Sequence, residues 1–208
     1  MTRQVRTTPR KHPRQDRSRE TVDAILEATA RVLVKHGFDG LTTNGVATAA
    51  GVSIGSLYQY FPNKEALVGA LFERHIEAMN AAVLAELTAV AELPMAAAVR
   101  RVIELTIRAH SIDPELHRML TEQLPRVGRL AKLRESDALT HRMVAGMLAL
   151  RQRELAIRDP DMASYVIVSA IEAIIHRAAL LDHARLRDPK LIDEATLLVT
   201  RYLGVAEN

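Results

Sequence analysis

The 208-residue sequence contains no cysteine and no tryptophan, and its aromatic residues are only four tyrosines and three phenylalanines. Disulfides, thiolate metal sites and thiol redox sensors all require cysteine, so none of them can operate within this chain. The sequence also lacks a nucleophile elbow, a phosphate-binding loop, a dinucleotide fingerprint and a paired-carboxylate motif, and its histidines show no compact spacing of metal ligands. We therefore predict that the protein is not an enzyme and holds no metal or organic cofactor.

Long uninterrupted hydrophobic runs are missing as well. The longest apolar-rich region, residues 162–181, contains Glu172, His176 and Arg177, and we predict that it is too polar to span a membrane. No apolar segment of the kind found in signal peptides follows the basic N-terminus. Because a hydrophobic content of 48% is ample for a core, we expect a cytoplasmic protein of one or two domains with no membrane partner.

Residues 42–65 predict two short helices joined by a tight turn and followed by a third helix. Thr42 or Thr43 can cap the first helix, and Gly51 can end it in a left-handed conformation. Ser53 can cap the second helix, which must end before Pro62 because proline disfavours helical geometry in the residue preceding it. Two short helices joined in this way are typical of a helix-turn-helix that reads DNA.

The second of these helices has the dimensions of a recognition helix. Seven residues rising about 1.5 Å each give about 10 Å, which fits within a major groove roughly 12 Å wide. Leu57 and Phe61 are spaced to face the core. The side chains left to face DNA are then Gly55, Ser56, Gln59 and Tyr60.

The same stretch resembles the TetR/AcrR family of bacterial transcriptional regulators. That family has a threonine pair, Ala-x-x-Ala-Gly-Val-Ser, Gly-Thr/Ser-Leu-Tyr-x-Tyr/His-Phe and a Lys-Glu pair, which correspond here to residues 42–43, 47–53, 55–61 and 64–65. The resemblance implies an all-α protein in which an N-terminal three-helix helix-turn-helix DNA-binding domain is joined by a long helix to a C-terminal helical ligand-binding and dimerisation domain. The expected DNA-contacting residues are Thr42, Thr43, Asn44, Ser53, Ile54, Gly55, Ser56, Tyr58, Gln59, Tyr60 and Lys64.

Two of these positions depart from the expected pattern. Asn44 stands where several family members carry a charged or other polar side chain, and with Gly45 it forms a poor start for a helix. Ile54 is spaced to lie on the buried stripe of its helix, although the family places this position at the DNA end. An exposed Ile54 could contact a thymine methyl group, and the alternative is a core residue.

Positive charge is concentrated at the N-terminus. The first 19 residues carry seven basic side chains and one acidic one, a net charge of +6, so the rest of this +3 chain carries −3. We predict that residues 1–18 form a flexible basic arm that neutralises DNA phosphates or enters a minor groove, the alternative being a solubilising tail. The predicted domains that follow are a helix-turn-helix domain over residues 19–64 and an effector-binding and dimerisation domain over residues 65–208.

The C-terminal part is predicted to be helical almost throughout. Apolar spacing favours one long helix over residues 64–90, and Pro94 and Pro114 each open a further helix, the second of which Pro125 ends. A long helical segment over residues 127–155 then stops at Asp159-Pro160. Such a long first helix would couple the DNA-binding domain to the rest of the chain.

The last two predicted helices carry apolar bands wider than one packing partner requires. A two-fold interface with a second copy of the chain would bury them and would set two recognition helices at successive major grooves, the alternative being an ordinary intramolecular pair. The predicted interface residues are Val166, Ile167, Ala170, Ile171, Ile174, Leu198 and Tyr202.

Several methionines suggest a ligand cavity, because methionine adapts to irregular apolar guests, although the same residues could form plain core. The candidate ligand-binding residues are Ile107, Met119, Leu120, Gln123, Met143, Met147 and Tyr165. The sequence thus predicts a one-component regulator, in the main a repressor, whose partners are a palindromic double-stranded DNA operator, a small-molecule effector and a second copy of itself. The rival hypotheses are an architectural DNA-binding protein without an effector, and a helical ligand carrier or enzyme whose DNA motif is vestigial.

Overall fold

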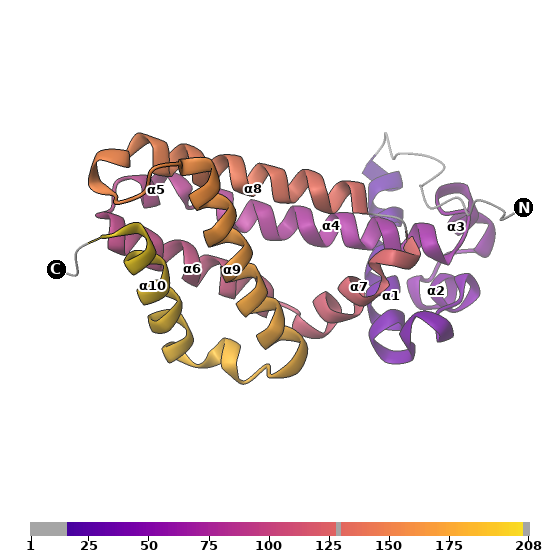
Figure 1. The fold of residues 1–208 in the computed structure, drawn as a ribbon. Helices are drawn as coiled ribbons and strands as arrows, with labels where there is room; N and C mark the ends of the chain where they lie inside the picture. The colour runs from indigo at the N-terminus through magenta and orange to yellow at the C-terminus, as the bar shows by residue number, and fades with distance from the viewer. Residues whose placement is uncertain (1–15, 128–129, 206–208) are drawn as a thin grey trace, which may run out of the picture. The chain divides into compact units, whose positions relative to one another are not determined.

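The computed structural model describes the backbone of residues 16–127 and 130–205, which is helical and contains no strand within those ranges (Figure 1). The predicted all-α class is confirmed. The chain forms two compact units, one comprising residues up to 77 together with 115–132, and the other residues 78–114 together with those from 133 onward. This division differs from the predicted boundary after residue 64. Residues 1–15 of the predicted basic arm lie outside the described residues.

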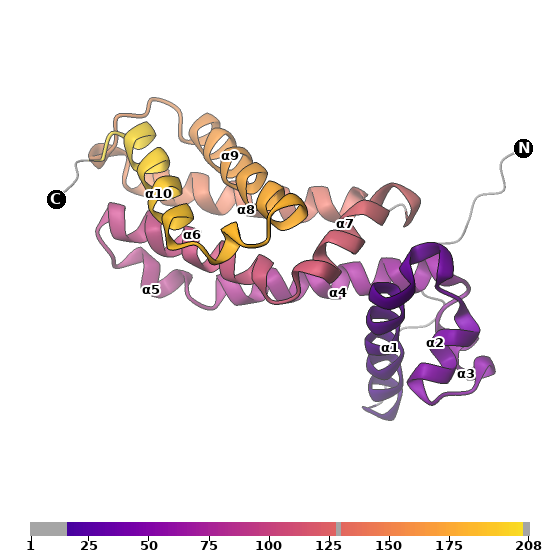
Figure 2. The same ribbon diagram turned by 90° about the horizontal axis from the view of Figure 1, so that it is seen from below.

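The first unit contains α1 (Asp16–Gly40), α2 (Thr43–Ala50), α3 (Ile54–Tyr60), the start of α4 (Lys64–Leu84) and α7 (Pro114–Val127). Helices α2 and α3 pack beside α1 (Figure 2). The largest side chains in its core are fully buried, and burying each one stabilises the fold by about 1.5–3 kcal/mol relative to leaving it exposed. They are Ile25, Leu33, Leu41, Leu57, Phe61, Leu67, Leu71 and Leu120.

Local caps and turns begin and end the short helices where the sequence predicts them. The hydroxyl of Thr42 accepts a hydrogen bond from the Gly45 N–H at 3.1 Å, and that of Ser53 accepts one from the Ser56 N–H at 3.0 Å. Gly37 and Gly51 both have φ of 67°, a left-handed conformation that side-chain-bearing residues rarely adopt. These glycines interrupt α1 and end α2, which brings the two helices that follow onto α1.

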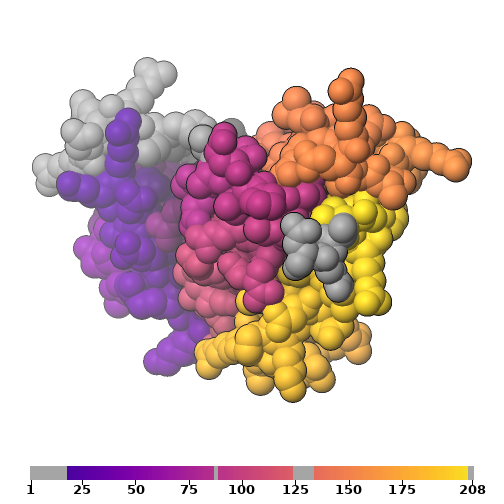
Figure 3. Space-filling view, turned by 90° about the vertical axis from the view of Figure 1, so that its left-hand side faces the viewer, coloured from indigo at the N-terminus to yellow at the C-terminus, as the bar shows by residue number. Residues whose placement is uncertain are grey.

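The second unit contains α5 (Leu87–Ala91), α6 (Met95–Ser111), most of α8 (Leu130–Leu150), η1 (Gln152–Glu154), α9 (Pro160–Leu181), η2 (Arg185–Arg187) and α10 (Pro189–Leu203). Its core lies among α6, α8, α9 and α10 and includes Ile103, Leu148, Ile175, Val199 and Leu203. The connection between α8 and α9 is held on the end of α10, because the Ala156 N–H donates to the Leu203 carbonyl at 2.8 Å. Figure 3 shows this connection in orange beside α10 in yellow.

Two helix boundaries differ from the prediction. The helix expected over residues 64–90 is two helices, because α4 ends at Leu84 and α5 begins only at Leu87. The helix opened by Pro114 does not end at Pro125 but continues to Val127. A proline near the end of a helix removes only one backbone hydrogen bond, so a helix held by packing can pass it.

Helix α9 also corrects a prediction. Its length and an 18-residue window with a mean hydropathy of 1.5 are sufficient for a membrane-spanning helix, so residues 162–181 are not too polar for one. Core helices of globular proteins meet the same criterion. Ala163, Ile171, Ile175 and Ala178 on α9 are buried among residues of α6, α8 and α10, so one side of the helix is a core surface.

Candidate functional site

The first unit presents the helix-turn-helix, with most of the predicted DNA-contacting side chains exposed. Ile54 is 37% exposed and Tyr58 41%, and Asn44, Gly55 and Gln59 are exposed as well. The structure therefore contradicts the alternative that Ile54 is a core residue. A short helix with an apolar and an amide side chain on its open face can offer both a methyl contact and hydrogen bonds to base edges.

A side-chain hydrogen bond ties the two helices of the motif together. The hydroxyls of Thr43, at the start of α2, and Tyr58, in α3, lie 3.1 Å apart. A second contact, between the Ser53 and Ser56 hydroxyls at 2.8 Å, closes the first turn of α3. The Thr43–Tyr58 contact thereby sets the N-terminus of α2 next to α3, an arrangement that suits a phosphate contact from one helix beside a base contact from the other.

Two predicted DNA contacts face inward instead. Tyr60 is only 8% exposed, and its hydroxyl lies 3.0 Å from the Ser18 hydroxyl oxygen in α1, so it fixes α3 to the scaffold rather than facing DNA. The Lys64 ammonium donates to the Phe38 carbonyl at 2.9 Å and lies 4.6 Å from the centre of the Phe38 ring. To reach a phosphate, Lys64 would have to leave both contacts.

Basic residues that the prediction did not include lie along the last turns of α1. Arg31, Lys35 and His36 line a groove of about 510 Å³ that also touches Thr42 and Gly45 at the start of α2. The Arg31 guanidinium donates to the Ala49 carbonyl at 3.2 Å. The signal available in the sequence was the i, i+4 spacing of Arg31 and Lys35, which places two cations on one side of a helix that otherwise reads as scaffold.

The second unit contains a cavity of about 120 Å³ between α6, α8, α9 and α10. Its wall is almost entirely apolar. The lining residues are Met95, Ala98, Val99, Val102, Ile103, Thr106, Thr140, Val144, Met147, Leu148, Ile167, Val168, Ile171, Glu172, Val199 and Leu203.

Of the predicted ligand-binding residues, Met147 lines this cavity and the others do not. Met119, Leu120 and Gln123 lie on α7 in the first unit, where Leu120 is core. Ile107 is buried in the core of the second unit, and Met143 is not among the lining residues. Tyr165 is 60% exposed and stacks on His141, with 5.7 Å between ring centres. Apolar spacing identifies the buried side of each helix but not which buried residues border a space.

One acidic side chain belongs to the cavity wall. Glu172 is partly buried, and the loss of hydration raises the pKa of its carboxyl, which the nearby charge of Asp137 raises further and that of His141 partly lowers. His141 already has a partner, since its Nε2 lies 3.2 Å from an Asp137 carboxylate oxygen. Burial lowers the pKa of His176, one turn further along α9, so this imidazole stays neutral at neutral pH.

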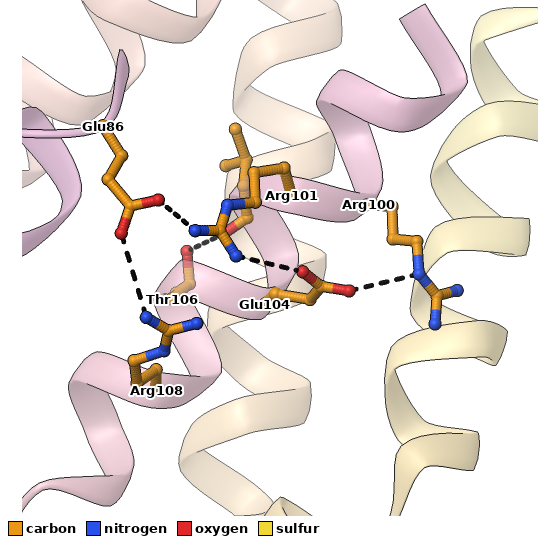
Figure 4. Close-up of polar contacts among 7 residues, drawn as sticks. Glu86, Arg100, Arg101, Glu104, Thr106 and Arg108 are labelled. Atoms are coloured by element: carbon orange, nitrogen blue, oxygen red, sulfur yellow. Dashed lines mark hydrogen bonds and ion pairs between the residues drawn. The ribbon is translucent and has the colours of Figure 1, made fainter. Parts of the chain in front are cut away.

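The outer side of α6 carries a network of ion pairs (Figure 4). Arg101 pairs with Glu86 and lies 3.4 Å from Glu104, and Arg108 lies 3.8 Å from the other Glu86 oxygen. Arg100 lies 3.2 Å from Glu104 and reaches α10 through Asp193 at 2.7 Å. Since Glu86 follows α4 by two residues, the network joins the end of α4 to the helix that forms one wall of the cavity.

The outward sides of α9 and α10 carry a set of exposed apolar side chains, which we term the α9–α10 apolar face. It consists of Met162, Tyr165, Val166, Leu181, Leu198 and Tyr202. Val166, Leu198 and Tyr202 were predicted as interface residues, and Ala170 and Ile174 are half-buried. Ile171 corrects the prediction, because it is 7% exposed and belongs to the core of its own subunit, and Ile167 lines the cavity.

Comparison with known proteins covers both parts of the chain. Residues 25–71 match the model of bacterial regulatory proteins of the tetR family, and residues 94–203 that of the tetracyclin repressor-like C-terminal domain. A helix-turn-helix-type transcriptional regulator of Mycobacterium bovis, Mb2274c, is 27% identical over 88% of this chain and 95% of its own length.

Two solved structures share the fold. A TetR-family regulator from Mesorhizobium loti superposes with a TM-score of 0.72 at 19% identity, over 90% of this chain and 98% of the other. The fatty acid degradation regulator FadR from Bacillus halodurans gives 0.67 at 20% identity, over 86% and 94%.

Proposed function

The chain belongs to the TetR family of bacterial transcriptional regulators, and from this premise we propose that it is a one-component repressor that binds a palindromic operator as a homodimer and leaves it when a small molecule binds. The observation that carries the proposal is the pairing of an exposed recognition helix with an apolar cavity in a separate unit of the same chain. An architectural protein would need only the helix, and a carrier or enzyme only the cavity. Such a repressor would act in the cytoplasm, where the chromosome lies.

The DNA half of the proposal rests on α2 and α3. Asn44, Ile54 and Gln59 are exposed and suited to base edges, while the capped starts of both helices supply N–H groups for phosphates. Lys35 and Arg31 add positive charge beside α2. Reading of sequence would then depend on a few side chains, and affinity on the phosphate contacts.

The dimer half rests on the α9–α10 apolar face. Six large apolar side chains on two neighbouring helices form a hydrophobic surface of a kind that marks protein contacts. A two-fold interface uses the same surface on both subunits, so one face suffices. Two copies joined there would present two recognition helices, which matches a palindromic operator.

The effector half rests on α6, which both lines the cavity and carries arginines that pair with Glu86. Val102, Ile103 and Thr106 face the cavity, whereas Arg101 and Arg108 on the same helix hold Glu86 at the end of α4. Because α4 begins directly after the helix-turn-helix, a ligand that shifts α6 would act on the DNA-binding unit through Glu86 and α4. Linkage then requires that operator DNA and ligand weaken each other by the same factor.

In vitro selection from random DNA duplexes tests the DNA half. We expect enrichment of an inverted repeat, bound by two chains, with an affinity that falls steeply with salt. Gln59→Ala should change which bases are enriched, whereas Leu150→Ala, which alters a side chain that is 89% exposed at the end of α8, should not. Recovery of unrelated sequences with similar affinity would favour the architectural protein, and absence of salt-dependent binding would favour the carrier.

The coupling is tested by Glu86→Gln with a compound that lowers the operator affinity of the unaltered protein. We expect the variant to bind the compound and to show a smaller change in operator affinity. Glu122→Gln is the matched control, because it removes an exposed ion pair with Arg118 on α7 that has no place in the proposed path. An equal response of both variants and the unaltered protein would contradict the role of Glu86.

A further inference from the structure

The cavity wall offers hydrogen-bond acceptors and no free donor among its described side chains. The Thr106 hydroxyl donates to the Val102 carbonyl at 2.9 Å, and the Thr140 hydroxyl donates to the Ser136 carbonyl at 3.2 Å. Each threonine hydroxyl therefore donates its one hydrogen to a carbonyl of its own helix. It can act toward a ligand only as an acceptor. The remaining lining side chains, apart from Glu172, are apolar.

Glu172 gives the wall its only charge among the lining residues that the structure describes. Two titratable groups of α8 act on Glu172, Asp137 and His141. The imidazole of His141 lies against the Asp137 carboxylate, so it does not neutralise the carboxylates of both Asp137 and Glu172. On α9, His176 is neutral at neutral pH because burial lowers its pKa. Among the described residues, no cationic group therefore forms an ion pair with the Glu172 carboxylate, and the charge of His141 acts on it only in part.

The arginines of α6 do not supply a counter-charge. Arg100 is held by Glu104 and Asp193, and Arg101 by Glu86 and Glu104, on the side of α6 that carries the ion-pair network (Figure 4). Asp193, the charged group that α10 brings to this helix, is paired there too. A partly buried carboxylate without an ion partner is destabilising, so the site is electrostatically incomplete in the absence of a ligand.

We infer that the cavity binds a small apolar molecule carrying one cationic nitrogen, with the Glu172 carboxylate as its counter-ion. This inference rests on the proposed function and names the class of its effector. A volume of about 120 Å³ is close to the roughly 150 Å³ engineered cavity that holds benzene, so one ring or a short alkyl chain fits beside the ammonium. The ammonium donates to Glu172 and to the threonine oxygens, and the apolar body fills the rest.

The same wall disfavours an anionic guest. A carboxylate ligand, such as a fatty acid, would meet Glu172 with like charge and would find no side-chain donor among the described lining residues. Repulsion of this kind discriminates between ligands as effectively as attraction does. The chemistry of the cavity therefore separates cationic effectors from anionic ones of equal size.

Isothermal titration calorimetry with three probes of one shape tests the inference on the full chain without DNA. We expect benzylammonium to bind at least tenfold more tightly than benzyl alcohol, and benzoate not to bind detectably. Glu172→Gln should weaken benzylammonium at least tenfold and leave benzyl alcohol unchanged. Glu122→Gln, which alters a glutamate on α7 that pairs with Arg118 and does not line the cavity, should leave all three probes unchanged.

Two further measurements keep the test independent of one variant. Benzylammonium affinity of the unaltered chain should fall as the pH falls through the pKa of Glu172, whereas that of benzyl alcohol should stay constant. Val144→Phe, which fills the cavity from α8, should abolish binding of both probes. Equal affinity for the three probes, tighter binding of benzoate, or unchanged benzylammonium binding in Glu172→Gln or in Val144→Phe would overturn the inference.

Release of operator DNA is measured separately, because it tests the proposed function rather than the chemistry of the cavity. If benzylammonium binds through Glu172 and operator affinity does not change, the cation site stands and the effector half of the proposed function fails. If benzoate but not benzylammonium releases the operator, the repressor stands and the cation site is wrong.

Discussion

The hydroxyl of Tyr58 lies 3.1 Å from that of Thr43, so one side-chain hydrogen bond joins the exposed sides of the two helices of the helix-turn-helix. Tyr60, two residues later, makes a bond of similar length with Ser18 but inside the domain. The two tyrosines of α3 therefore have different structural roles. One holds the DNA-facing surface together and the other fixes the helix to α1.

Phenylalanine substitutions separate these roles. Tyr58→Phe should weaken operator binding by about twofold to tenfold, the equivalent of one net hydrogen bond, and leave the fold stable. Tyr60→Phe should instead lower the free energy of unfolding by about 1 kcal/mol and leave operator affinity almost unchanged. Fluorescence anisotropy with operator DNA and urea unfolding of both variants give the comparison. The opposite assignment of the two effects would show that Tyr60 turns outward on DNA.

Lys64 and Lys35 provide a second matched pair. Each phosphate contact adds about 0.9 to the slope of the logarithm of affinity against the logarithm of salt concentration. Lys64→Met should leave that slope unchanged and lower the thermal midpoint, because Lys64 donates to the Phe38 carbonyl. Lys35→Met should lower the slope by about one phosphate contact, because this exposed lysine lines the groove beside α2. A reduced slope for Lys64→Met alone would support the original prediction that Lys64 binds DNA.

A charge placed on the α9–α10 apolar face should prevent dimerisation. Val166→Arg would bury an unpaired cation in the proposed interface, so we expect a monomer in analytical ultracentrifugation and weaker operator binding. Leu150→Arg is the control, since Leu150 is also apolar and is 89% exposed, but lies at the end of α8. Dimers of unchanged stability in Val166→Arg would exclude this face as the interface.

Glu172 should make stability depend on pH in a characteristic direction. Its folded-state pKa is raised above the ordinary 4.5, so the folded protein binds this proton more tightly, and stability falls as the pH rises from 4.5 through the raised value. Glu172→Gln should therefore be more stable than the unaltered chain at neutral pH, and the difference should disappear below pH 4.5. Thermal unfolding across this range measures it.

Glu154→Gln is the control, because the pKa of Glu154 is shifted in the opposite direction. Its hydrogen bonds with Arg151 lower the pKa of Glu154, so its contribution is present above the ordinary 4.5 and is lost as the pH falls through the lowered value. This variant should lose stability at neutral pH, and only slightly, because the pair is exposed. A Glu172→Gln variant that behaves like Glu154→Gln would mean that Glu172 has an ion partner in solution.

The DNA-binding motif was predictable because its determinants are local. Thr42, Gly51, Ser53 and Pro62 begin and end helices through contacts within a few residues, so their effects can be inferred from residue type and spacing. The inward orientation of Tyr60 was not predictable in this way. Its partner, Ser18, is 42 residues away, and only the packing of α3 on α1 brings them together.

The ligand site, in contrast, could not be predicted from local contacts. Spacing correctly marked many residues as buried, but the predicted ligand-binding set was spread over four helices, α6 to α9, and Met147 alone of that set lines the cavity. Glu172 was noted only as an interruption of an apolar run. Its significance depends on Asp137 and His141 from α8 and on two threonines whose hydroxyls are occupied elsewhere.

The sequence by itself determined that this protein is helical, that residues 42–65 form a helix-turn-helix, and that the chain resembles TetR regulators, because caps, turn glycines and prolines act over a few residues. Only the tertiary structure decided which side chains remain exposed on α3, which apolar residues of α9 stay uncovered, and where a cavity meets a carboxylate. Those properties arise between helices that are distant in sequence, and their energies depend on burial and on neighbouring charge, which no local pattern records.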